Sequence, residues 1–591
     1  MLRRFSIATA MCSTGLSISL AWIITGATPA KQSTADWVEL ALQQPPSGEQ
    51  LPPAGSAVPS VTLRVITHLV QVNVIVNDKH GLPITGLTKD DFILLDNNHP
   101  QEVRLFSAET NSVSNQPPSP LPHDTFTNLL SERATVPSSV TVILLDGLNT
   151  EFADQALSRK QVLRFLQQLR PQDRVALYWL GNNLYTLQDF TTDVANLREA
   201  LAHSAPKSSR ELSESDVDYL SPNNPNSSIP SGVPAPQAPN REALRSAFDQ
   251  RVANESAKYR VRLTVAALIA IAHHVGGLKG RKNLVWVSGS FPFDLGNEKF
   301  DLNWANDTGV SFSAQVERAA QALTDAGVAV YPVDARGLMG NGVTAAGDYS
   351  EASHPEFADG DEHLPTHVTP GNLETMKVLA ERTGGKAFYG SNDLSEAIRR
   401  AIDDSRVTYT LGFYPAAEKW DGSFHNIKVR VKAPGAEVRA RTGYFALPDS
   451  ARTPPNSVQA IISQTAISQL DATGIGVRAH VEPTHTAGER ALNVDLHLDL
   501  HDVHLEQNNG LWTGILETVF LQLNSHGEII QVLDETLQLS LPQNVYEQAL
   551  KDGLRNTKHI RILSGATQVC VVLRDTSNGN IGSLSVPLAL N

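Results

Sequence analysis

Residues 140–150 begin with β-branched and apolar residues and end in a polar turn at Asp146 and Gly147. A short apolar run bounded by a turn predicts a buried, parallel strand. Apolar residues then recur at helical spacing between positions 162 and 169, and a second apolar run follows at 174–180, which together predict a β-α-β unit. Asp146 therefore falls at the carboxyl end of a buried strand, where open α/β sheets bind their ligands.

The segments that follow keep a fixed order along the chain. They are LRPQDRVALYWL, FTTDVANLREAL, GRKNLVWVSGSFP, AGVAVYPVDARGL and LAERTGGKAFYG. With the 140–150 stretch, this order resembles the von Willebrand factor type A (VWA) domain in its bacterial, acidobacterial-type branch, over residues 140–405. The segments on either side also resemble that branch. The resemblance implies a doubly wound, Rossmann-like central α/β domain.

The length of 591 residues predicts about three to four domains, so we expect a multi-domain chain of α/β and all-β parts. Two incomplete β-rich segments flank the central domain, and either they form one sandwich into which that domain is inserted or they are two small independent modules. Alternating apolar and polar residues predict a further β-sandwich at the C-terminus. The expected parts are a first β segment at 61–110, a polar connection at 107–136, the VWA-like domain at 136–405 with insertions at 204–240 and 339–370, a second β segment at 406–447, and the C-terminal sandwich at 457–591.

Residues 1–30 have the charged, apolar and small-residue order of a secretory signal peptide, and 31–60 form a Pro- and Gly-containing linker. We therefore expect a periplasmic, secreted or cell-surface protein, with an uncleaved N-terminal anchor as the alternative. Cleavage would leave Cys570, in an apolar run, as the remaining cysteine, which predicts a buried and inert thiol.

The formal charge of −14 disfavours binding to nucleic acid and to anionic lipid. The enzyme motifs in the sequence are incomplete. The SGS at 288–290 lacks the G-x-S-x-G pattern of the hydrolase nucleophile elbow, and the TGGK at 383–386 is not a P-loop. Pro365 separates His363 from His367, which excludes a zinc-protease helix. We therefore predict no enzymatic activity.

Many VWA domains hold a divalent cation through an Asp-x-Ser-x-Ser loop, a separate Thr and a second Asp. Matching this sequence to that pattern places Asp146 and Thr150 at the first and last positions of the loop. Leu148 stands at the middle position, where the pattern has Ser, and Gly289 stands where the pattern has the second Asp. The resemblance thus implies a degenerate metal site, with no certain cofactor and with Mg²⁺ or another divalent cation as the candidate. Asp146 is alternatively a capping or ion-pair carboxylate. The other candidates for ligand contact at this edge are Asn149, Ser288, Ser290 and Asp334.

His497, His501 and His504 are explained by a solvated polar strand face rather than by metal binding. The function that these observations predict is non-catalytic binding of a protein ligand or an envelope component, as in protein-protein or surface adhesion. The alternatives are a metal-free structural or accessory component of an envelope complex and, third, a metal-dependent hydrolase using residues 348–367.

Overall fold

The computed structural model describes only part of the chain. The predicted signal peptide, the linker and the 339–370 insertion lie outside the described residues, as does the 204–240 insertion except for its last three residues, which belong to a helix. The described residues are 69–110, 121–129, 139–203, 238–278, 280–291, 312–337, 371–391, 393–404, 406–415, 420, 423–446, 468, 470–486 and 489–588.

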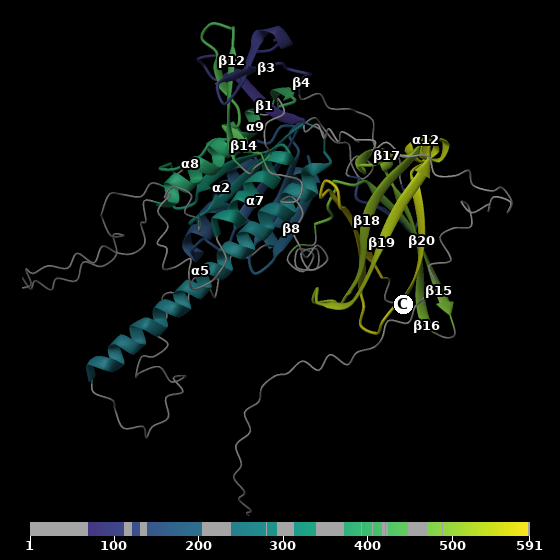
Figure 1. Cartoon of the computed structure of the whole chain (residues 1–591). Coiled ribbons are helices and arrows are strands. Elements are labelled where there is room, and N and C mark those ends of the chain that lie inside the picture. Colours follow the sequence, from purple (N-terminus) through teal and green to yellow (C-terminus); the bar gives the residue numbers. More distant parts are fainter. Residues whose placement is uncertain are drawn as a thin grey trace, which may run out of the picture. The chain divides into compact units, whose positions relative to one another are not determined.

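The central sheet has five strands in the order β10-β9-β6-β7-β8. Figure 1 labels β8 and most of the helices of this part of the chain. The first four are parallel and β8 is antiparallel to β7. All residues of β6, β9 and β10 are buried, which agrees with the apolar centres of these segments, although β9 begins with Arg281, Lys282 and Asn283. The strands are β6 (Ser139–Asp146), β7 (Val175–Leu180), β8 (Leu184–Thr191), β9 (Arg281–Ser288) and β10 (Val328–Asp334).

Each face of this sheet has its own hydrophobic core, because successive side chains of a strand point to opposite faces. Val142 and Leu144 of β6 belong to a core with α5, α7 and α8, whereas Ile143 and Leu145 belong to a core with α2, α3 and α9. The helix predicted at 244–275 is longer in the structure. The helices are α2 (Phe152–Leu166), α3 (Val194–His203), α5 (Ala238–Gly276), α7 (Phe312–Asp325), α8 (Gly371–Thr383) and α9 (Leu394–Asp403).

The β segments on either side of the central domain share two antiparallel sheets, β13-β1-β11-β4 and β14-β12-β2-β3. β1 pairs with β11 and β2 pairs with β12, so strands from before and after the central domain are neighbours in both sheets. One hydrophobic core includes residues of both sheets. The strands are β1 (Val70–Asn77), β2 (Phe92–Asp96), β3 (His99–Gln101), β4 (Leu105–Thr110), β11 (Val407–Phe413), β12 (Phe424–Val431), β13 (Glu437–Arg439) and β14 (Gly443–Phe445), with a 3₁₀ turn, η2 (Lys89–Asp91).

The C-terminal part also consists of two sheets around a shared core. One has the order β20-β16-β15-β5, and the other has the order β17-β18-β21-β22 with β19 paired to β18. The apolar residues at 528–533 and 536–541 predict two strands, but the structure has one strand there, β19. Helix α12 was not predicted. The elements are β15 (Val477–Thr486), β16 (Glu489–Leu498), η3 (Leu500–Asp502), β17 (Glu506–Asn508), β18 (Leu511–Leu523), β19 (Ile529–Pro542), α12 (Gln543–Asp552), β20 (Leu554–Arg561), β21 (Gln568–Asp575) and β22 (Ile581–Pro587).

The segment expected to be a polar connection, 107–136, contains a strand that belongs to the C-terminal part. β5 (Thr125–Thr127) pairs with β15, and Phe126 packs against the C-terminal core. Asn128 is buried, and its side-chain amide donates to the carbonyls of Ala472 and Ile475 at 2.7 and 2.8 Å. A strand of three residues is too short to show periodicity, so the sequence alone did not reveal it.

Within the described residues, no helix is both long enough and apolar enough to cross a membrane.

Candidate functional site

Asp146, the last residue of β6, is 2 % exposed and is the hydrogen-bond acceptor at the centre of the candidate site. Its Oδ1 accepts from the backbone N–H of Asn149 at 3.0 Å, and its Oδ2 accepts from Asn149 Nδ2 at 2.9 Å. Two donors come from β9: Trp286 Nε1 at 3.0 Å and Ser288 Oγ at 2.8 Å, both to Oδ2. These bonds join the loop after β6 to the neighbouring strand.

The rest of the loop is fixed in the same way. Asn149 Nδ2 also donates to Thr264 Oγ1 of α5 at 2.9 Å, and Thr150 Oγ1 accepts from the backbone N–H of Gly289 at 2.8 Å. Asn149 and Thr150 are each 2 % exposed. The polar groups of the loop therefore face inward, toward β9 and α5, rather than toward solvent.

Gly147 allows Trp179 of β7 to lie over this loop. A Cβ at position 147 would be 2.1 Å from Trp179 Cζ2, so any other residue would displace the indole ring. Leu148, which stands where the VWA pattern has a hydroxyl, is fully buried in the core on the α5 face. This loop position therefore contributes packing instead of an oxygen ligand.

Burial raises the pKa of the Asp146 carboxyl above its ordinary value of 3.8, although the hydrogen bonds from Asn149, Ser288 and Trp286 oppose the rise. A carboxyl whose pKa is higher in the folded state binds its proton more tightly there. Its contribution to stability is therefore full below the ordinary pKa and is lost as the pH rises through the folded value.

This shift gives a pH prediction. We expect the free energy of unfolding of the wild type, minus that of Asp146→Asn, to decrease as the pH rises from about 4 toward neutrality. Urea unfolding at a series of pH values measures this difference. A difference that grows with pH would mean that the pKa is lowered in the folded protein.

A small cavity of about 10 Å³ adjoins the carboxyl group. That volume is roughly the space needed by one water molecule, whereas sites for small molecules enclose about 300–1,000 Å³. This cavity therefore has no room for a substrate. Its lining residues are Leu145, Asp146, Thr150, Gln155, Ser158, Trp179 and Val287.

Asp334, at the end of β10, is at the same sheet edge but is not bonded to Asp146. Its carboxylate accepts from Arg336 Nε at 2.9 Å and from Arg336 Nη2 at 2.8 Å, as a two-bond ion pair. Asp154 of α2 lies near this pair, and its pKa is raised by burial and then by the charges of Glu151 and Asp334. The edge thus presents mixed charges at its β10 side.

The structure brings four of the predicted residues together: Asp146, Asn149, Thr150 and Ser288. Ser290 joins through its carbonyl oxygen, which lies 2.6 Å from Ser288 Oγ. The single hydroxyl proton of Ser288 can be donated either to this carbonyl or to Asp146, but not to both at once. Trp286 and Thr264 were not predicted as site residues, because Trp286 lies in an apolar strand and Thr264 lies in a helix recognised by its apolar spacing. Side chains that serve a polar site from within core elements have no distinct sequence pattern.

The histidines of the C-terminal part lie beside single carboxylates. His497 Nε2 is 3.8 Å from Asp495 Oδ2, and His501 Nδ1 is 2.8 Å from Asp499 Oδ1. Nowhere in the described part of the chain do three His, Cys, Asp or Glu side chains form a group that could hold a metal ion.

No protein-family model matches this sequence, and a comparison with curated proteins finds no significant match. Solved structures similar to it include a von Willebrand factor type A protein. That protein, from Catenulispora acidiphila, is 8 % identical, with 62 % of this chain and 80 % of that chain covered and a TM-score of 0.24. The acidobacterial-type branch has no match and stays a prediction.

Two further structures are similar over different shares of the chain. An aerotolerance-related membrane protein from Bacteroides fragilis NCTC 9343 is 14 % identical, covers 45 % of this chain and 98 % of its own, and has a TM-score of 0.23. The three N-terminal domains of the type V pili tip protein Mfa5 from Porphyromonas gingivalis are 10 % identical, with coverages of 82 % and 96 % and a TM-score of 0.24. Because these TM-scores are low, the proposals below rest on the geometry of this chain alone.

Proposed function

We propose that the chain is an exported, non-catalytic VWA-like protein that binds a protein partner at the carboxyl edge of its central, doubly wound sheet, without a bound cation. The observation that carries this proposal is the saturation of Asp146, whose two carboxylate oxygens already accept from Asn149, Trp286 and Ser288. A small-molecule substrate is disfavoured by the size of the adjoining cavity.

A cation would have to displace these donors. Mg²⁺ requires oxygen ligands in near-octahedral array, but the groups directed at Asp146 include the N–H donors of Asn149 and Trp286. Asn149 Nδ2 lies between the carboxylate and Thr264 Oγ1, so an amide links the two oxygens that a cation would otherwise bridge. The residues present therefore fit a hydrogen-bonded loop better than a metal site.

The contact surface is expected around Phe152, which opens α2 directly after the site loop. Its side chain is 57 % exposed, and large aromatic residues are frequent anchors of protein interfaces. Glu151 next to it is also exposed, and Arg336 lies near enough to influence the charge of Asp154. An aromatic anchor with charges of both signs around it suits a protein surface.

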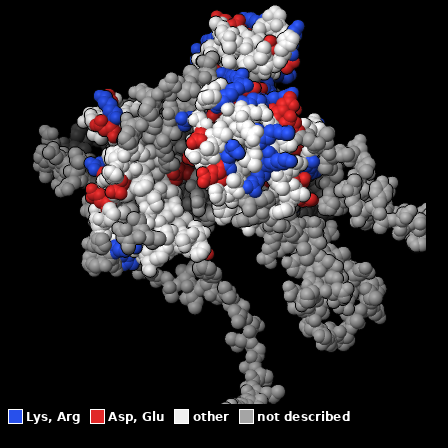
Figure 2. Space-filling view, turned by 180° about the vertical axis from the view of Figure 1, so that it is seen from behind, with Lys and Arg blue, Asp and Glu red and all other residues white. Residues whose placement is uncertain are grey.

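The charge distribution supports a protein partner rather than nucleic acid. On the face that Figure 2 shows, groups of Lys and Arg lie next to groups of Asp and Glu. A polyanion would require a basic field, and the formal charge is −14. Export rests on the signal peptide predicted at residues 1–30.

The cation-free site is tested by titrating Mg²⁺, Mn²⁺ and Ca²⁺ into the purified chain and measuring the heat, with Asp146→Ala alongside. We expect no saturable binding to either protein, because the acceptor oxygens are occupied. Saturable binding that disappears in Asp146→Ala would instead establish metal-dependent adhesion, and acidic protein ligands would become the ones to screen.

The partner contact is tested with Phe152→Glu. We expect this variant to recover at least about tenfold less partner than the wild type when each is purified from its own cell envelope, because loss of a central aromatic anchor costs about 2 kcal/mol or more. Leu82→Glu, at a 62 % exposed position of the flanking sandwich, is the control. Equal recovery by both variants would place the contact elsewhere.

The alternative function is that of an accessory component of an envelope complex. It differs from adhesion in the lifetime of the complex with the partner. Constitutive assembly predicts that the partner stays bound through high-salt washing, whereas a reversible adhesion contact with charged surroundings weakens as ionic strength rises. The same purification at two salt concentrations separates these functions.

A further inference from the structure

We propose that two copies of this chain pair through their β19 strands, as an antiparallel dimer centred on Thr536. β19 has 14 residues and, among the described strands, pairs with β18 alone. Its outer edge therefore presents unpaired backbone donors and acceptors along the length of the strand, which is a template for a further strand.

β19 lacks the protection that the other edges of the C-terminal part have. β5 and β17 have three residues each, and β20 carries Arg and Lys residues at positions 555, 558 and 561. The edge of β22 is covered by the 472–475 segment, since the N–H of Ser583 donates to the carbonyl of Ala472 and Thr473 bridges to Gly582. β19 contains neither Lys nor Arg, and its only Pro is the last residue. Its charged residues are Asp534 and Glu535, and the rest of this long edge has no charged side chain to oppose another strand.

The core face of β19 is also incompletely covered. Leu537 and Leu539 pack against the C-terminal core but stay only partly buried, whereas Leu516 and Phe520 of β18 are 0 % and 1 % exposed. A strand added beside β19 would remove these leucine side chains from water. Burial of this apolar area therefore favours the addition of a strand, and so do the unpaired backbone groups of the edge.

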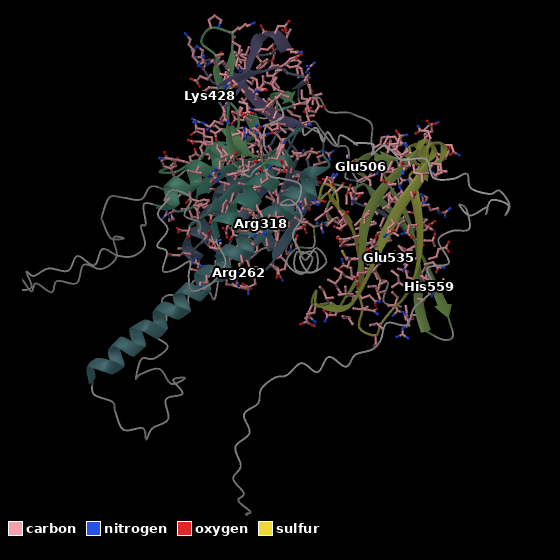
Figure 3. The ribbon with its side chains drawn as sticks, viewed as in Figure 1. Arg262, Arg318, Lys428, Glu506, Glu535 and His559 are labelled. Carbon is pink, nitrogen blue, oxygen red and sulfur yellow. The ribbon has the colours of Figure 1, made fainter. Side chains whose placement is uncertain are left out.

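The charges of β19 make a second copy a suitable occupant. Pairing centred on Thr536 places Asp534 opposite Gln538 and aligns residues 530–542 of both strands. Centring it on residue 534 or 535 would instead oppose two carboxylates, which is destabilising. Glu535, labelled in Figure 3, is already paired with Lys558 of β20. No like charges therefore meet in the proposed register.

Cysteine cross-linking tests the register. In antiparallel strands, residues directly opposite have Cα atoms about 4.5–5.5 Å apart, within the range of a disulfide. We expect the full-length chain with Thr536→Cys, and with Cys12→Ser to remove the N-terminal cysteine, to form a disulfide-linked dimer on oxidation. Gln538→Cys is the matched control, because its two copies would be about 13 Å apart across the pair. Cys570 is buried and does not interfere.

Sedimentation tests the dimer itself. The wild type is expected at twice the mass of one chain, and Thr536→Lys at the mass of one chain, because two lysines would meet at the centre. Val545→Lys, at a 43 % exposed position of α12, should stay dimeric. A monomeric wild type, or equal cross-linking at positions 536 and 538, would overturn the proposal and leave the edge to another polypeptide or unused.

Discussion

Replacing Asp146 with alanine should destabilise the central domain by about 4 kcal/mol. The substitution removes the acceptor of the Asn149 N–H, the Trp286 indole N–H and the Ser288 hydroxyl, all of which are buried. A buried donor that loses its acceptor costs about 1–3 kcal/mol, and the N–H groups of both Asn149 and Trp286 lose the Asp146 acceptor here. Hydrogen exchange of the β6 and β9 amides measures the effect as a loss of protection within this domain.

Asp154→Ala is the control for this prediction. Asp154 is a carboxylate at the same edge, but it is only half-buried, so its removal exposes less to an apolar surrounding than the removal of the fully buried Asp146 does. We expect a change of no more than about 0.5 kcal/mol. If Asp146→Ala were as mild as this control, Asp146 would not hold the loop together, and its oxygens would be available for another role.

Asn128→Ala should destabilise the C-terminal part by about 3 kcal/mol. Asn128 donates to the carbonyls of Ala472 and Ile475, and its Oδ1 accepts from the N–H of Val477 at 2.7 Å. The alanine would leave three backbone groups without these partners in a buried place. Because Asn128 directly follows β5, we also expect the amides of β5 to exchange faster.

The control here is Asn580→Ala. Asn580 is exposed, and its side chain makes one long contact, 3.5 Å, with the carbonyl of Asp502. A change within about 0.5 kcal/mol is expected in thermal unfolding followed at the C-terminal strands. Unchanged exchange of β5 in Asn128→Ala would show that the strand is held by Phe126 and its pairing alone.

The elements of the central domain could be predicted because each has a strong local pattern. The apolar run at 140–145 is a buried strand, and the spacing of Val162, Phe165 and Leu166 is that of a helix packed on one face. The polar residue at the end of the run marked Asp146 for the same reason, since an acidic side chain rarely ends an apolar strand without a role. Local pattern also explains why β19 was divided in two, because Asp534 and Glu535 interrupt its apolar residues.

Trp286 and Thr264 could not be predicted in the same way. Trp286 lies 140 positions after Asp146, and Thr264 lies 115 positions after Asn149. They reach the site only through the fold, since they lie on β9 and α5. The core of the central domain contains no cysteine, so it is specified by the shape and volume of its side chains. Many different sequences satisfy such a requirement. A hydrogen bond from a core tryptophan needs one particular juxtaposition, and no local spacing encodes it.

The sequence by itself determined most strands and helices of the central domain, the position of Asp146 at a strand end, and the acidic charge that disfavours polyanions. The tertiary structure decided that β1 pairs with β11, that β5 belongs to the C-terminal sheet, and that Asp146 is enclosed by donors. The physical reason is the range of the interactions. Periodicity and turn chemistry act within a few residues, whereas strand partners and buried hydrogen bonds depend on which distant segments pack together.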